Sequence, residues 1–130
     1  GTQYDPKRML KPLAPEATSR TGVLHKAGAI SMARWEPGTA TGDFSILLSD
    51  MPALDANPAA SGDNAGYAAF GHVVEGMDVV QKIHAAPVSA TKGEGAMRGQ
   101  MIEAPVRILS ARRAKLPPPL APGGSEPSPR

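Results

Sequence analysis

The 130-residue chain contains no cysteine, which excludes disulfide bonds, thiol catalysis and cysteine-based zinc sites. It also lacks any apolar run near the ~20 residues that a membrane-spanning helix needs, so we expect no membrane partner. Its first residues do not show the basic and then apolar layout of a secretory signal, although the sequence is compatible with a leader upstream of Gly1. The compartment is therefore unknown, with cytoplasmic, periplasmic and secreted locations all open.

Aromatic residues form only 4% of the chain, so the core has to be built mainly from aliphatic side chains and methionine, and we expect it to be modest. Basic residues are scarce in the middle, because residues 30–80 contain seven acidic residues and one base, Arg34. No basic stripe interleaved with aromatic residues is present. This charge pattern argues against nucleic acid as a partner.

Short apolar segments separated by turn-forming residues predict a mainly β chain with antiparallel strands. The expected strands cover residues 27–33, 44–48, 67–74 and 105–110. Val79, Val80 and Ile83 lie on one side of a short helix predicted near residues 76–84, and Pro87 prevents this helix from continuing.

Proline and glycine divide the chain further. Residues 1–22 contain several prolines and charges and are expected to be extended. Residues 49–66 are predicted to form a long surface loop of the kind that usually carries function. Prolines dominate after Lys115, so we predict one domain over residues 1–115 and a disordered Pro/Gly-rich tail over residues 116–130.

Three blocks in a fixed order resemble the C-terminal half of a cyclophilin-type peptidyl-prolyl cis-trans isomerase. They are Gly-Ala-Ile-Ser-Met-Ala-Arg at residues 28–34, Thr-Gly-Asp-Phe at 41–44 and Tyr-Ala-Ala-Phe-Gly at 67–71. The order and spacing of the blocks make the likeness more specific than any single short motif. The resemblance implies an antiparallel cyclophilin-like β-barrel, incomplete in this chain, that isomerises X–Pro bonds and assists protein folding without a cofactor. It also implies a monomer whose partners are proline-containing polypeptides.

In the family that the chain resembles, an Arg donates a hydrogen bond near the proline nitrogen. This Arg belongs to a segment that precedes the Ser-Met-Ala block, and we expect it upstream of Gly1. The resemblance therefore assigns no catalytic residue to this chain. It assigns six substrate-binding positions, which are Ala33, Arg34, Asp43, Ser45, Leu54 and Tyr67.

Several of these positions depart from the family pattern. The backbone of Ala33 is expected to hold the peptide and Leu54 to form an apolar wall, as in the family. Asp43 stands where Gln is common, and a carboxylate only accepts hydrogen bonds. Ser45 stands where an aromatic ring commonly forms the floor of the proline socket, and Arg34 where smaller or polar residues are usual. The resemblance thus predicts a shallow, polar socket with reduced activity.

Two other functions stay open. The chain is also compatible with a proline-peptide binding module that has little or no turnover, because of Asp43, Ser45 and the missing Arg. A structural β domain without a ligand is the third alternative. Leu54 would suit any β core, and Tyr67, at a position that holds His or Tyr in the family, would suit a packed ring with its hydroxyl hydrogen-bonded.

The sequence predicts neither a metal site nor a nucleotide site. The three histidines, His25, His72 and His84, belong to different predicted elements, so we expect them to be packed or solvated. The glycines within residues 88–101 do not follow a suitable strand, and this segment is predicted to be an ordinary loop.

Overall fold

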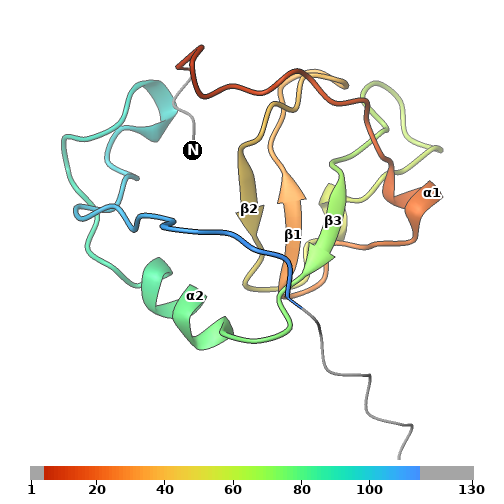
Figure 1. Cartoon of the computed structure of the whole chain (residues 1–130). Coiled ribbons are helices and arrows are strands. Elements are labelled where there is room, and N and C mark those ends of the chain that lie inside the picture. Colours follow the sequence, from red (N-terminus) through yellow and green to blue (C-terminus); the bar gives the residue numbers. More distant parts are fainter. Residues whose placement is uncertain (1–4, 115–130) are drawn as a thin grey trace, which may run out of the picture.

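A computed structural model describes residues 5–114 of the chain (Figure 1). Its elements in chain order are α1 (Thr18–Thr21), β1 (Ala29–Met32), β2 (Phe44–Ile46), the 3-10 turn η1 (Pro52–Leu54), β3 (Ala69–His72), α2 (Met77–His84) and the 3-10 turn η2 (Gly95–Met97). The predicted tail, residues 116–130, lies outside the described residues.

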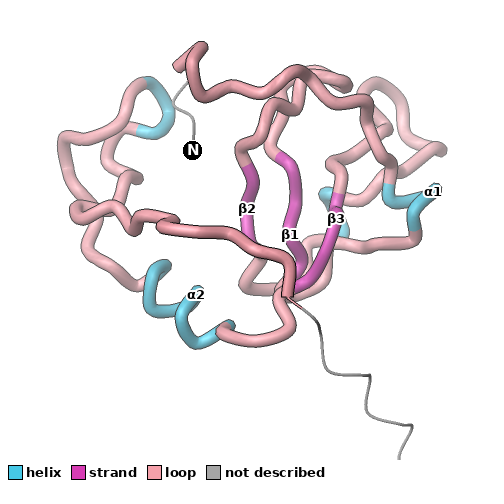
Figure 2. Tube along the Cα trace, in the orientation of Figure 1, coloured by secondary structure: helices cyan, strands magenta, loops and turns pink. Residues whose placement is uncertain are grey.

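The three strands form one antiparallel sheet in the order β2-β1-β3, with β1 in the middle (Figures 1 and 2). On one side of β1, Ile30 lies opposite Ile46 and Ser31 opposite Ser45. On the other side, the register with β3 shifts between Ile30 and Ser31, so this pairing is irregular. The structure confirms three of the predicted strands, each shorter than expected, and a mainly β chain with an open sheet.

The two faces of the sheet differ because side chains alternate along a strand and directly opposed residues share a face. Ile30 and Met32 of β1, with Ile46 of β2, make one apolar face. Ser31 and its opposite residue Ser45 lie on the other face, which we call the serine face. The serine face also carries Ala29 and, opposite Ser31, Ala69; both are buried, so this face bears much of the small core together with the buried Ser31 hydroxyl.

The predicted helix is confirmed as α2, Met77–His84. Asp78 accepts a hydrogen bond from Lys82 one turn later, at 3.1 Å, which supports the helix on its exposed side. None of its residues is buried. Every helix within residues 5–114 is too short or too polar to cross a lipid bilayer.

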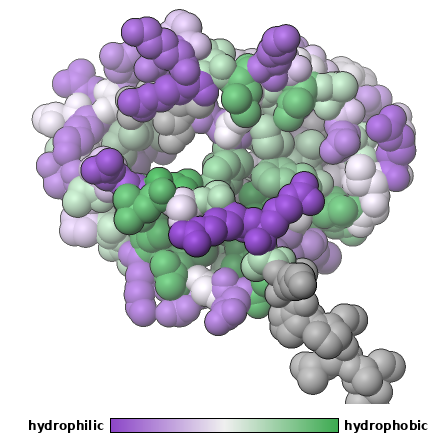
Figure 3. Space-filling model, viewed as in Figure 1, coloured by the Kyte–Doolittle hydropathy of each residue, from purple (hydrophilic) through white to green (hydrophobic). Residues whose placement is uncertain are grey.

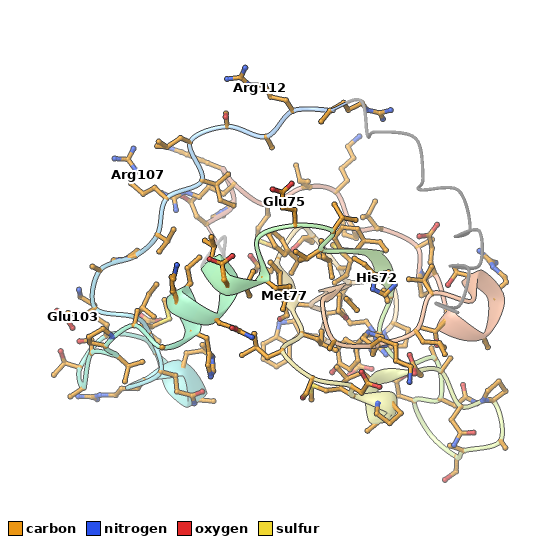
Figure 4. All side chains as sticks on the ribbon, turned by 90° about the horizontal axis from the view of Figure 1, so that it is seen from below. His72, Glu75, Met77, Glu103, Arg107 and Arg112 are labelled. Atoms are coloured by element: carbon orange, nitrogen blue, oxygen red, sulfur yellow. The ribbon has the colours of Figure 1, made fainter. Side chains whose placement is uncertain are left out.

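The strand predicted at residues 105–110 is wrong, since the described chain has no strand there. The segment runs extended past the sheet, and Figure 4 shows Arg107 and Arg112 pointing outward from it. Ile108 is 74% exposed. The alternating pattern favours extended backbone, but a strand also needs a neighbour to accept its hydrogen bonds, and the local sequence says nothing of that neighbour.

Residues 1–22 were expected to be extended throughout, which is wrong for the single helical turn α1. Leu13 forms an isolated antiparallel bridge with Ala40, which holds this N-terminal segment across the end of the sheet. The hydroxyl oxygen of Thr18 at the start of α1 accepts a hydrogen bond from the Ala56 N–H at 2.8 Å. These contacts, rather than helical periodicity, fix the course of the segment.

The core is small, as the low aromatic content predicts. Its buried apolar residues are Ala29, Ala40, Leu47 and Ala69. Many larger apolar side chains, including both phenylalanines, are about half exposed. Figure 3 shows apolar surface between hydrophilic residues on the face seen in Figure 1. The described part of the chain therefore leaves much of its apolar surface uncovered.

Candidate functional site

A small hollow of about 240 Å³ lies where β1 ends. Ala33 and Asp43 line it, with Trp35 and Thr39 of the connecting loop. The Ala33 N–H donates to the Asp43 backbone oxygen at 2.8 Å, which continues the β1–β2 pairing by one step. The Thr39 hydroxyl accepts from the Trp35 N–H and donates to the Glu36 oxygen, so this single side chain fixes the loop.

A larger hollow of about 630 Å³ adjoins it. Its walls are mostly apolar and include Met32, Phe70, Leu10 and Leu13. Met32 belongs to the apolar face of the sheet, so this hollow lies on the side opposite the serine face.

Arg34 lines both hollows, and its side chain is only 6% exposed. Its guanidinium makes a two-pronged ion pair with Asp63, at 2.8 Å and 3.1 Å. It also donates to the backbone oxygens of Gly66 and Trp35, and it lies 4.7 Å from the centre of the Tyr67 ring. All five N–H donors of Arg34 are thereby engaged within the chain, so it holds the loop and offers no donor to a peptide.

The Arg34–Asp63 pair sets the electrostatics of the loop. The hydrogen bond from Arg34 lowers the pKa of the Asp63 carboxyl from its usual value of 3.8. Asp63 therefore stays ionised near neutral pH and keeps the loop at the end of β1.

Of the six predicted substrate-binding residues, Arg34 lines both hollows. Ala33 and Asp43 share the small hollow, and Tyr67 lines the large one. Leu54 lines neither hollow, but its backbone oxygen accepts the Tyr67 N–H at 2.9 Å.

Ser45 also lines neither hollow. It lies exposed on the serine face, opposite Ser31. Ser31 in turn is covered by His25, which contacts Asp55 beside Leu54. Ser45 and Leu54 therefore border the same side of the sheet.

The sequence analysis missed the contacts of three residues in this region: His25, Thr18 and Asp63. His25, expected to be packed or solvated, is packed: it is buried and bonded to Asp55, 30 positions away, a partner that the sequence did not predict. No pattern in the sequence around His25 or Asp55 indicates that these two residues pair. The sequence does contain a signal for an ion pair of Asp63, because Arg34 is the one basic residue among the acidic residues at 30–80. Within residues 5–114 no cluster of three or more potential ligands could hold a metal ion.

Comparison with known proteins defines the class. The sequence profile of the family described as "Cyclophilin type peptidyl-prolyl cis-trans isomerase/CLD" matches residues 1–113. The chain therefore belongs to the cyclophilin-type peptidyl-prolyl isomerase family, as its resemblance implied.

A similar curated protein is the peptidyl-prolyl cis-trans isomerase of Acinetobacter baylyi. The two are 38% identical over 112 residues, which cover 85% of this chain and 54% of the Acinetobacter protein. The chain thus spans about half the length of this relative.

Proposed function

We propose that this chain forms part of the peptide groove of a prolyl isomerase and acts on X–Pro bonds in polypeptides. The observation that carries the proposal is the family match over residues 1–113. We place the groove along the serine face, from Ala33 and Asp43 at the small hollow past Ser45 to Leu54. Tyr67 is tied to Leu54 through the backbone but lines the large hollow on the opposite side of the sheet, so we do not place it in the groove.

Catalysis of prolyl isomerisation requires only a few features of a protein surface. Rotation about a peptide bond crosses a barrier of ~18–20 kcal/mol that arises from amide resonance. Lowering the barrier requires a surface for the proline ring, a grip on the flanking peptide and a donor that favours the twisted amide over the planar one. Leu54 supplies apolar surface, and the small hollow supplies room for the flanking peptide. Arg34 is fully bonded, so it does not supply this donor.

The finer fold assignment is also a proposal. We infer that the open sheet is part of a closed antiparallel barrel. β2 and β3 each have one strand neighbour within residues 5–114, and the large apolar hollow borders Met32 and Phe70. The extended residues 105–110 carry the pattern of a further strand. Exposed edges and apolar surface of this kind are usually covered in a stable β protein.

The proposal is tested with two proteins: the 130-residue chain and a hybrid in which the part of the Acinetobacter protein that the chain does not match precedes Gly1. A proline-switched peptide assay measures isomerisation, and NMR titration with a short Ala-Pro peptide maps binding. We expect acceleration by the hybrid and amide shifts at Ala33, Ser45 and Leu54 in both proteins. Shifts confined to the large hollow, or no binding by either protein, would contradict the groove.

A binding module without turnover is the second candidate, favoured by the bonded state of Arg34 and by the exposed Ser45. Binding by the hybrid without acceleration would support this alternative. Acceleration by the hybrid would reject it.

A further inference from the structure

His25 is a buried side chain whose two ring nitrogens are both hydrogen-bonded. It is 1% exposed, and Nδ1 lies 2.7 Å from the Asp55 Oδ1 atom. Nε2 lies 2.8 Å from the Ser31 hydroxyl oxygen. A carboxylate only accepts, so Nδ1 carries a hydrogen and donates it to Asp55, and Nε2 shares the second hydrogen bond with the Ser31 hydroxyl.

An Asp-His-Ser series at these distances is known from nucleophilic enzymes, but Ser31 cannot act as a nucleophile here. It is 4% exposed and lines neither of the two hollows. The bonds therefore serve to hold two parts of the chain together.

The parts that His25 joins are the central strand and one wall of the proposed groove. Ser31 lies in β1, two residues before Ala33. Asp55 directly follows Leu54 at the end of η1. The imidazole ring thus spans the distance between β1 and the Leu54 wall, and its rigid shape fixes that distance.

Two backbone contacts would remain if the ring were changed. The His25 N–H donates to Asp55 Oδ1 at 3.0 Å, and the His25 oxygen accepts the Met51 N–H at 2.8 Å. After loss of a ring hydrogen bond, the loop around Asp55 would therefore still be held to the backbone of His25. The separation between β1 and Leu54 would no longer be fixed. A change of position, rather than unfolding, is the expected effect.

We propose that His25 is a positioning residue that sets the separation between β1 and the Leu54 wall, and so the width of the peptide groove. The description of this surface as a peptide groove rests on the proposed function. The spacing itself is a property of the protein without peptide and is measured independently.

Two variants of similar size each keep one of the two hydrogen bonds of the ring and remove the other. His25→Asn places an amide N–H near the position of Nδ1 and keeps the bond to Asp55. His25→Gln places its amide N–H near Nε2, so it reaches Ser31 but loses Asp55. The position of Leu54 is followed in the peptide-free chain from the NMR chemical shifts of its methyl groups and the contacts that these groups make.

We expect His25→Gln to shift the Leu54 methyl contacts and to weaken binding of the Ala-Pro peptide roughly tenfold, the scale of one charged hydrogen bond. His25→Asn loses Ser31 instead and should displace Leu54 as well, because the side chain then no longer reaches β1. Ser89→Ala is the control, because Ser89 is also a buried hydroxyl, 6% exposed, and its side chain bonds to Thr91, Lys92 and Glu103, which line neither hollow.

An unmoved Leu54 in either the Asn or the Gln variant, or an equal displacement in Ser89→Ala, would overturn the proposal. If His25→Gln does not fold, Asp55→Ala removes the ring contact together with the bond from the His25 N–H, from a side chain that is 18% exposed, and a shift of Leu54 at least as large is expected. Unchanged Leu54 contacts in Asp55→Ala would also overturn it. A displaced Leu54 in a protein that binds no proline peptide would support the spacing role and reject the proposed function, so the two failures are distinguishable.

Discussion

Replacing Gly66 with alanine tests whether the loop that precedes β3 is packed directly on the Leu54 segment. Gly66 has a φ of +62°, and a Cβ atom there would lie 2.6 Å from the backbone of residues 54–56. Gly62, in the same loop, has a φ of +75° and nothing within 4 Å of its would-be Cβ. Gly62→Ala is therefore a matched control, since both variants place a side chain in left-handed backbone but only one meets a neighbour.

The expected changes in stability follow from two costs, that of the left-handed backbone and that of packing the new methyl group against its neighbours. Left-handed backbone costs an alanine roughly 1–2 kcal/mol, and forcing a methyl group into packed atoms costs a further 1–3 kcal/mol, roughly. Gly62→Ala should therefore lower the free energy of unfolding by about 1–2 kcal/mol and Gly66→Ala by about 2–5 kcal/mol. Urea denaturation followed by circular dichroism measures both. Equal midpoints for the two variants would refute the close packing of Gly66 on the Leu54 segment.

Three further predictions concern the same region. Because the hydrogen bond from Arg34 lowers the pKa of Asp63 from 3.8, the link should hold above that pH and be lost as the pH falls through the lower folded-state value. NMR titration of the Asp63 carboxyl carbon checks this, and an inflection at or above 3.8 would contradict it. In the hybrid, Asp43→Gln together with Ser45→Phe should tighten peptide binding about tenfold by adding a donor and an apolar floor. Unchanged affinity by calorimetry would mean that these positions do not face the peptide. Thr18→Val should cost roughly 1–3 kcal/mol because it leaves a part-buried N–H without its acceptor, and thermal unfolding with no loss would argue against that bond.

The sequence predicts the local elements of this fold well. Strands at residues 29–32 and 44–46 follow from short apolar runs, and α2 follows from the helical spacing of Val79, Val80 and Ile83. Each of these signals is contained within one segment. The error at residues 105–110 has the opposite origin, because a strand is defined by its partner and the pattern of one segment does not name that partner.

The candidate site shows the same division. The family blocks place Ala33, Asp43 and Leu54 in one region, and their role in binding stays a prediction. The sequence could not show that Arg34 donates most of its hydrogen bonds to Asp63 and Gly66, or that His25 bonds to Asp55. Both depend on contacts about 30 positions apart, which arise only when the loop folds back on β1.

The chain has a single tryptophan, Trp35, which is 73% exposed at the rim of the small hollow. Indole emission moves to shorter wavelength when the ring leaves water. The molecule therefore carries a native optical reporter of occupancy at one end of the proposed groove, free of interference from any second indole. Stopped-flow fluorescence on the unlabelled chain would give arrival and departure rates directly.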